Sequence, residues 1–282
     1  MKKIKFCIML ILMFAIFIPC ISADDILEHD GEQSSEIEES KERKTRPVRL
    51  AIGVGGIFGG LREETDSTIN HYFTLLTFHI DGNVEQGNFL HTFSIGGNFG
   101  YTTLPYEDKY PNREFEFMTI RANMEYALDY RLWGDDTFPG FLGGAFRTDF
   151  HILVPFEIPK ITAIASLGVH ATQKWIIDPK HSLSLSVTVP LFSYAVRPPY
   201  VGVDELFELY TSQGEVPMIF TLGKFASLHN YWALFGDLKY HFRLIDLISL
   251  NAGFGFELSR INIPAPLIIA STRLYAGVAF TF

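Results

Sequence analysis

Apolar and polar residues alternate with a period of two over long stretches of this chain. Between Met118 and Leu132 the even positions carry apolar side chains, whereas the odd positions include Arg121, Glu125 and Asp129. An amphipathic helix would mix these two sets, because its apolar stripe recurs every three to four residues. A β-strand keeps the two sets on opposite sides. The pattern therefore predicts a strand with one apolar and one polar face.

The same alternation recurs in residues 181–190, 231–244 and 268–282. Soluble strands usually have about five or six residues, whereas a tilted strand needs roughly ten to cross a bilayer. A charged side chain on a lipid-facing surface costs roughly 2–4 kcal/mol at the midplane, so the polar rows have to face inward. Because a sheet edge cannot stay open in lipid, the sheet has to close. We therefore predict an all-β fold, a closed antiparallel transmembrane β-barrel. A soluble sandwich or cup with apolar rows inward is the alternative.

Eleven segments fit the strand pattern. They are residues 47–58, 70–81, 89–102, 115–132, 141–153, 160–175, 181–195, 216–227, 230–243, 247–261 and 267–282. Bacterial single-chain barrels have even strand numbers, so one strand has been missed or split. We predict about 12 strands, with 10 as the alternative. We place the miscount in the connection 197–214, where residues 203–210 form either a short helix or the missing strand.

Turn-forming residues gather in the connections between these segments. Short periplasmic turns are expected at residues 81–88, 134–139 and 178–180, and surface loops at residues 61–69, 103–114 and 197–214.

The first residues have the order of a cleavable secretory signal. Lys2, Lys3 and Lys5 precede an apolar run of residues 6–18, and small residues follow up to Ala23. The run is shorter than the ~20 apolar residues of a membrane-spanning helix, which argues against an uncleaved anchor. We expect residues 1–23 to be removed and the protein to be exported to the outer membrane.

Cys20 raises the alternative of a lipid-anchored protein, in which a cysteine is acylated after processing. The bulky Phe17 and Ile18 and the neighbouring Pro19 fit the required signal poorly. The second cysteine, Cys7, also lies in the predicted signal. Cleavage of the signal therefore leaves no cysteine for disulfides or thiol chemistry.

Residues 24–46 form a strongly acidic segment before the predicted barrel, residues 47–282. The segment holds nine acidic and four basic residues and no aromatic residue. So few apolar side chains cannot offset the entropy cost of ordering, and we predict a disordered or loosely helical periplasmic tail. Without the three lysines of the signal, the formal net charge falls from −9 to −12, which argues against nucleic-acid binding.

The last residues alternate up to an aromatic residue. This stretch, residues 274–282, resembles the C-terminal assembly signal of bacterial outer-membrane proteins. More loosely, the whole chain resembles small outer-membrane β-barrels of Bacteroidota-like or spirochaete-like bacteria. The resemblance implies insertion by the barrel-assembly machinery, with Tyr275, Phe280 and Phe282 in the assembly signal, and contact with outer-membrane lipids. It implies no activity.

Charged residues of both signs share the predicted inward faces. The expected lumen-lining residues are Arg121, Glu125, Asp129, Arg131, Arg147, Asp149, Asp237, Lys239, His241, Arg243, Glu257 and Arg273. A barrel of ten to twelve strands is narrow, and an unpaired charge away from water is strongly unfavourable. We expect these groups to pair across the lumen. A narrow hydrophilic channel or a ligand-lined cup is the alternative for the same rows.

Two classes of function fit such a barrel. We favour a non-enzymatic outer-membrane protein, acting as a small pore or as a surface-exposed binding or structural protein. The alternative is a lipase-like or protease-like hydrolase, because histidine can act as a general base near neutral pH. Its candidate catalytic residues are Asp149 with His151, and His181 with Ser184. A hydrolase requires such groups to converge at the barrel rim with a nucleophile and anion donors.

No cofactor or metal is predicted. The glycines between residues 53 and 60 lack the Lys-Ser or Lys-Thr ending and the following helix of a phosphate-binding loop. No cluster of histidines and carboxylates has the spacing of a zinc site, and no calcium-loop motif occurs.

Overall fold

The structure, a computed structural model, describes β-strands and short turns. The described residues are 48–63, 70–104, 115–154, 160–197, 223–263 and 266–282. The chain divides into two units, Met1–Lys44 and Thr45–Phe282. The predicted signal and acidic tail lie outside the described residues, as do most of the predicted surface loops. Both therefore stay predictions.

The strands follow the predicted segments. They are β1 (Arg49–Glu63), β2 (Asn70–Gln86), β3 (Phe89–Leu104), β4 (Phe115–Trp133), β5 (Gly140–Val154), β6 (Lys160–Ile176), β7 (His181–Val196), β8 (Gly223–Ser227), β9 (Tyr231–Arg243), β10 (Ile248–Ile261) and β11 (Leu267–Thr281).

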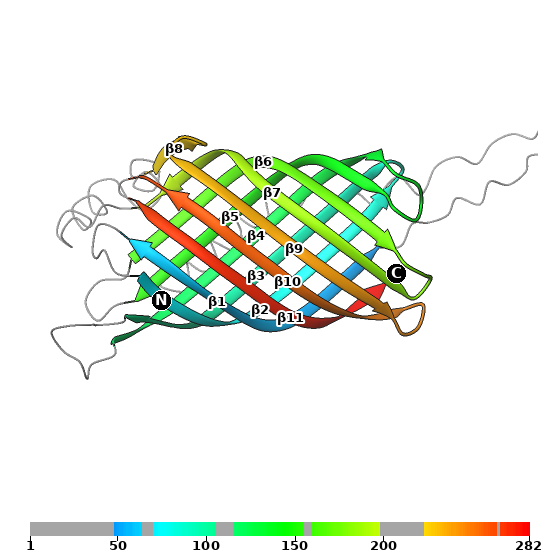
Figure 1. Cartoon of the computed structure of the whole chain (residues 1–282), viewed down its shortest axis with the longest axis horizontal. Helices are drawn as coiled ribbons and strands as arrows, with labels where there is room; N and C mark the ends of the chain where they lie inside the picture. Colours follow the sequence, from blue (N-terminus) through cyan, green and yellow to red (C-terminus); the bar gives the residue numbers. More distant parts are fainter. Residues whose placement is uncertain (1–47, 64–69, 105–114, 155–159, 198–222, 264–265) are drawn as a thin grey trace, which may run out of the picture. The chain divides into compact units, whose positions relative to one another are not determined.

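Ten of these strands close into a barrel (Figure 1). Each pairs antiparallel with its neighbours, in the order β1 to β7 and then β9 to β11, and β11 pairs with β1. The all-β closed antiparallel barrel is confirmed. The prediction of about 12 strands is wrong, and the alternative of 10 is confirmed.

The extra strand, β8, explains the miscount. Residues 192–196 of β7 pair with β8, and residues 181–188 pair with β9, while β6 occupies the other edge of β7. Partner numbers fall steadily along β7, so β8 and β9 run in the same direction as two parts of one interrupted strand. The sequence pattern therefore counted one interrupted strand as two, because residues 228–230 separate its two parts. The error does not come from the connection 197–214, where we expected it.

Pro190 lies on β7 opposite this interruption. The pairing between β6 and β7 shifts there, because Leu167 pairs with Phe192 whereas the next residue, Gly168, pairs with Pro190. Proline lacks a backbone N–H and is confined in sheets to edges and bulges. Among the described residues, β7 has no partner on its other edge between residues 188 and 192. The backbone ladder of the wall is therefore interrupted on both edges of β7 at this point.

Exposure alternates along the strands as the sequence pattern predicts. On β11, Leu274 is 55% exposed and Val278 is 36% exposed, whereas Tyr275 and Ala279 are buried. The outward rows are mostly apolar, and the inward rows carry most of the charged residues. No helix in the described part is long and apolar enough to cross a membrane.

The two ends of the barrel differ. At the turn end, on the right of Figure 1, the connections after β2, β4, β6 and β9 are short. Gly87 and Gly134 there have φ angles of 63° and 84°, which other residues rarely adopt. Val48 and Phe282 also meet at this end through two backbone hydrogen bonds of 3.1 and 2.9 Å. The loop end carries the other connections, of which the longest joins β7 to β8.

Two aspartates fix the predicted turns at the turn end. The Oδ1 atom of Asp135 accepts the Thr137 hydroxyl at 2.7 Å and the backbone N–H groups of Thr137 and Phe138. The Thr137 hydroxyl is the main reason why the pKa of Asp135 is lowered. In the same way, the backbone N–H of Lys180 lowers the pKa of Asp178. Side-chain acceptors that replace a missing backbone partner are typical of tight turns.

Candidate functional site

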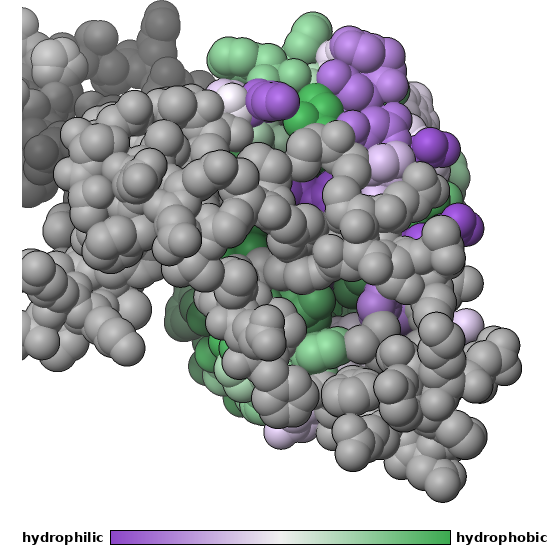
Figure 2. Space-filling view, turned by 90° about the vertical axis from the view of Figure 1, so that its left-hand side faces the viewer, coloured by the Kyte–Doolittle hydropathy of each residue, from purple (hydrophilic) through white to green (hydrophobic). Residues whose placement is uncertain are grey.

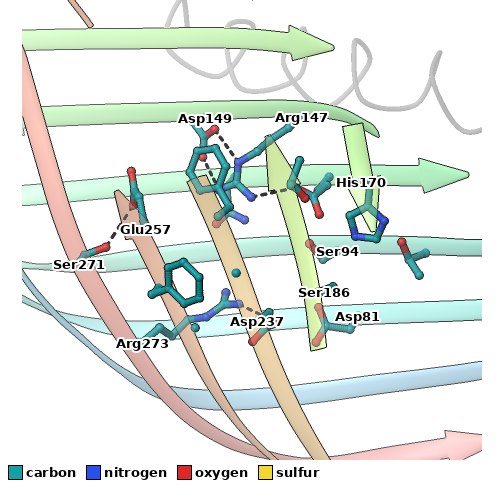
Figure 3. Close-up of a pocket in the computed structure, with 18 of the residues that line it drawn as sticks. Asp81, Ser94, Arg147, Asp149, His170, Ser186, Asp237, Glu257, Ser271 and Arg273 are labelled. Carbon is teal, nitrogen blue, oxygen red and sulfur yellow. Dashed lines mark hydrogen bonds and ion pairs between the residues drawn. The ribbon is translucent and has the colours of Figure 1, made fainter. Parts of the chain in front are cut away.

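The lumen contains a cavity of about 180 Å³, which is the candidate site (Figure 3). A water molecule needs roughly 10–15 Å³ of such space, so the cavity has room for on the order of ten waters. All ten strands of the ring contribute lining residues. The cavity is therefore a narrow space along the barrel interior.

Arg147 on β5 is the centre of one charged cluster. Its Nε and Nη2 atoms donate to the two oxygens of Asp149 at 2.8 and 2.7 Å, and Nη1 donates to Glu125 at 3.1 Å. The guanidinium carbon lies 3.7 Å from the ring centroid of Phe235. Bidentate pairing and an aromatic face together fix the guanidinium in one position.

Arg121 on β4 reaches across the lumen to β10. Its Nη2 atom donates to Oε2 of Glu257 at 2.6 Å, and the Ser271 hydroxyl donates to the same oxygen at 3.2 Å. The Arg121 guanidinium also lies 5.7 Å from the ring centroid of Phe73. Because β4 and β10 are not neighbours in the ring, this ion pair bridges the barrel interior.

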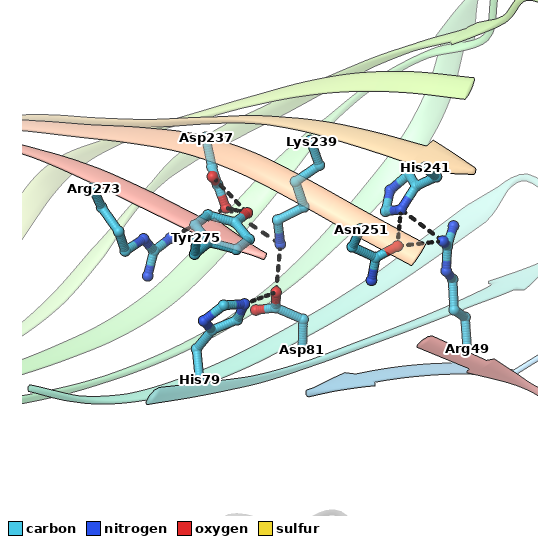
Figure 4. A network of polar contacts seen from close by, with 9 residues as sticks. All are labelled: Arg49, His79, Asp81, Asp237, Lys239, His241, Asn251, Arg273 and Tyr275. Atoms are coloured by element: carbon cyan, nitrogen blue, oxygen red, sulfur yellow. Dashed lines mark hydrogen bonds and ion pairs between the residues drawn. The ribbon is translucent and has the colours of Figure 1, made fainter. Parts of the chain in front are cut away.

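A second charged cluster joins β2, β9 and β11 (Figure 4). The Lys239 ammonium lies 2.9 Å from Asp81 and 3.3 Å from Asp237. Arg273 donates to Asp237 at 3.2 Å, and the Tyr275 hydroxyl lies 2.9 and 3.0 Å from the two oxygens of the same carboxylate. Two cations thus balance two carboxylates inside the barrel.

Three further contacts lie in the lumen nearer the turn end. Nη2 of Arg49 lies 2.6 Å from Nδ1 of His241 and donates to Oδ1 of Asn251 at 2.9 Å (Figure 4). Lys174 on β6 forms an ion pair with Glu85 on β2. These contacts tie strands together that do not pair through their backbones.

Asp129 on β4 and His170 on β6 form an enclosed polar pair. Nδ1 of His170 lies 2.6 Å from Oδ2 of Asp129, and the two side chains are 2% and 0% exposed. The Thr172 hydroxyl donates to the same carboxylate oxygen at 3.5 Å. Sequence reasoning placed Asp129 in the lumen but did not identify His170 as its partner.

An apolar layer lies in the loop-end half of the lumen. Its buried members are Ile57, Leu61, Phe73, Leu75, Ala195, Ala226, Tyr231, Ala233, Phe235, Ile261, Leu267 and Ile269. Figure 2 views the barrel from the loop end and shows apolar side chains in green toward the middle. Sequence reasoning missed this layer because it treated each inward row as polar throughout. The signal was present, since the inward row of β2 changes from Asp81 to Leu75 and Phe73 toward the loop end.

Most of the predicted lumen residues border the cavity. Nine of the twelve do so, and the exceptions are Asp129, Arg131 and Arg243. Arg131 donates to the exposed Asp136 in a turn, and the backbone N–H of Arg243 donates to Lys180 at the turn end. Sequence reasoning missed the lumen contacts of Arg49, Glu85 and Lys174, which lie near strand ends. Alternation alone does not distinguish lumen from rim there.

The candidate catalytic residues are only partly brought together. Asp149 and His151 both border the cavity from β5, but Arg147 holds both oxygens of the Asp149 carboxylate. Ser184 also borders the cavity, whereas His181 lies 2.5 Å from the hydroxyl of Tyr240, on the outward row of β9. The structure therefore does not bring His181 and Ser184 together.

The described strands and turns hold no group of three or more histidine, cysteine or carboxylate side chains that could bind a metal ion. Many charged groups in the described part of the lumen contact one another as ion pairs and hydrogen bonds.

One solved structure shares the fold, and two others match at lower TM-scores. The outer membrane protease OmpT from Escherichia coli matches with a TM-score of 0.54 and 7% identity, over 85% of this chain and 98% of that one. Neisserial surface protein A matches at a TM-score of 0.34 and 7% identity, over 83% and 97% of the two chains. The attachment invasion locus protein Ail of Yersinia pestis matches at 0.27 and 13%, over 83% and 99%.

No family model and no curated protein matches the sequence. At 7% identity, the likeness to OmpT concerns the fold and not the activity. The ten-stranded closure, the apolar outward rows and this likeness agree with one another. The chain has the fold of an outer-membrane β-barrel.

Proposed function

We propose that this chain is an integral outer-membrane protein with an occluded barrel, which works without catalysis as a binding or structural protein at its loop end. Of the two non-enzymatic functions that the sequence predicts, this proposal favours a binding or structural protein over a small pore. The observation that carries the proposal is the mutual pairing of the charged side chains that cross the lumen.

The charges of the lumen are engaged with one another. Arg121, Glu257 and Arg147 are 11%, 14% and 13% exposed, and each is in an ion pair. In a wide aqueous pore such groups would keep most of their water. Because several pairs join strands on different sides of the ring, they span the lumen, narrow it and act as struts.

The apolar layer adds a second barrier on the loop side of the charged clusters. Phe73 is buried, and its ring faces Arg121. Phe235 is also buried, and its ring faces Arg147. Hydrophobic constrictions hinder ions because water leaves them readily. An ion crossing the barrel would have to pass both layers.

The loop end is the proposed working surface. The longest connection of the barrel joins Val196 to Gly223 at this end, whereas the turn end has short connections. Binding residues are commonly found on loops that a rigid scaffold holds in place. We therefore propose that binding partners reach the loop end from outside the barrel. The lipid of the outer membrane surrounds the barrel wall.

The hydrolase alternative has less support. Asp149 is held by Arg147, and the Asp129 and His170 pair is enclosed. A hydrolytic site needs a base and a nucleophile that a substrate can reach.

Single-channel recording tests the proposal. Purified, folded protein in planar bilayers should show no discrete openings across a range of salt concentrations, because the paired charges and the apolar layer block ions. An open porin in the same bilayers controls for insertion and detection. Stable, reproducible conductance steps from the folded protein would overturn the occluded barrel and favour the pore.

A further inference from the structure

The outer wall of the barrel carries two charged side chains among the strand residues whose side chains the structure describes. They are Arg62 at the end of β1 and Arg260 near the end of β10, and both are exposed. The other described outward positions on the strands are apolar or uncharged. Both arginines lie at the loop end.

Strand register places the two arginines next to one another. Arg62 pairs with Ile268 across β1 and β11, and Arg260 pairs with the same Ile268 across β10 and β11. Directly opposed residues on antiparallel strands have Cα atoms roughly 5 Å apart, so the two arginine Cα atoms are about 10 Å apart. Trp232 pairs with Arg260 on the other side. On the four consecutive strands β9, β10, β11 and β1, this outward row therefore consists of Trp232, Arg260, Ile268 and Arg62.

The free-energy cost of placing an arginine in lipid determines the depth of this row in a membrane. An arginine on the lipid face costs roughly 2–4 kcal/mol at the midplane and little near the interface. Tryptophan is enriched at the same level, where its ring meets the headgroups. The row therefore lies at headgroup level in the leaflet that faces the loop end.

The wall below the row suits an acyl chain. The next outward row holds Leu258, Ala270 and Gly60 in register, and the row after that holds Phe256, Thr272 and Phe58. Ala270 has a small side chain and Gly60 has none. This part of the wall is therefore recessed between the larger Leu258 and the aromatic rings of the next row. Headgroup contacts and chain contacts can thus be made by the same lipid.

We propose that Arg62 and Arg260 form a binding site for the phosphate of an anionic membrane lipid, with the acyl chain lying along Leu258, Ala270 and Gly60. Guanidinium groups bind phosphate through charge-assisted and often bidentate hydrogen bonds. Nε of Arg260 donates to Oδ1 of Asn262 at 2.9 Å, which orients this side chain at the loop end. The site goes beyond the proposed function and does not depend on whether the lumen is closed.

Quenching of Trp232 by brominated lipids tests the site. Trp133 and Trp175 lie toward the turn end, so replacing both with phenylalanine leaves Trp232 as the single reporter among the three tryptophans. The protein is reconstituted in phosphatidylcholine vesicles with a minor fraction of brominated phosphatidic acid or of brominated phosphatidylcholine. We expect phosphatidic acid to quench Trp232 preferentially.

The arginines should account for this preference. In the double variant R62Q and R260Q, the relative affinity for phosphatidic acid should fall at least about tenfold, which corresponds to about 1.4 kcal/mol. The matched control R131Q and K180Q removes two positive charges from the turn end and should keep the preference. Equal quenching by both lipids in the parent protein, or an unchanged preference in R62Q and R260Q, would overturn the site.

Two further outcomes separate the possible causes. Competition by millimolar inorganic phosphate would show that the arginines bind free phosphate, and would overturn the lipid site. Absence of quenching by either brominated lipid would show that the wall does not face lipid. A conducting pore with an intact lipid preference would overturn the proposed function alone.

Discussion

At the scale of single residues, the barrel interior is organised by polar pairs that have left bulk water. Asp129 is fully buried against His170, and Arg147 is fixed by two carboxylates and the ring of Phe235. Removing one partner of a buried pair leaves the other without compensation. The cost of a substitution should therefore depend on how deeply the pair lies.

The pair of Asp129 and His170 gives the clearest test of this dependence. We expect His170→Ala to lower the free energy of unfolding by roughly 3 kcal/mol or more, because the buried Asp129 carboxylate loses its partner. Arg131→Ala is the control, since its partner Asp136 is 97% exposed, and should cost less than about 1 kcal/mol. Urea unfolding of the reconstituted variants measures both values.

A double-mutant cycle completes this test. Replacing both Asp129 and His170 with alanine should cost less than the sum of the two single changes, because no unpaired group remains. Additive costs, or equal costs for His170→Ala and Arg131→Ala, would show that the buried pair does not act as a unit.

At the scale of strands, alternation was enough to find every element of the barrel. The eleven predicted segments correspond to β1–β11, and the faces predicted for β4, β9 and β11 are the observed ones. The count failed because period two does not report continuity. β8 and β9 share one edge of β7, and the turn at residues 228–230 separates them. Only the cross-strand register reveals that β8 and β9 are two parts of one interrupted strand.

Glycines mark where two neighbouring strands approach closely. A Cβ atom added to Gly143 on β5 would lie 2.6 Å from the Cα atom of Asp129 and would also clash with the Leu128 carbonyl oxygen on β4. Such a contact cannot be relieved by rotating a side chain. A Cβ atom added to Gly97 on β3 would meet nothing within 4 Å.

We therefore expect Gly143→Ala to destabilise the barrel by about 1–3 kcal/mol, as overpacking does in well-packed cores, and Gly97→Ala to have little effect. The folded fraction is measured as the compact, heat-modifiable band in gel electrophoresis of unheated samples. Equal folded fractions for the two variants under increasing urea would contradict the close approach of β4 and β5.

At the scale of the whole molecule, the barrel has a mostly apolar exterior and an interior in which paired charges and buried apolar side chains surround a narrow cavity. The sequence predicted most of the charged residues inside, because a charge on the lipid face is costly away from the membrane interface. It did not reveal which charges meet, since the contacts of Arg121 with Glu257 and of Lys239 with Asp81 join residues far apart in the chain. The apolar layer was missed for a related reason, because inward positions toward the loop end are buried by each other and not by lipid.

Cysteine accessibility in proteoliposomes tests this account most directly. Single cysteines replace outward Ala252, Ala270 and Ala276 and inward Ser186, Ser271 and Ala279, with Cys7 and Cys20 changed to serine where present. Each variant is treated with a small charged thiosulfonate and, separately, with a lipid-soluble maleimide. We predict that outward cysteines react only with the maleimide and that inward cysteines react with neither reagent. Fast reaction of inward cysteines with the charged reagent would show an open aqueous lumen, and the same reaction at outward positions would show that the wall does not face lipid.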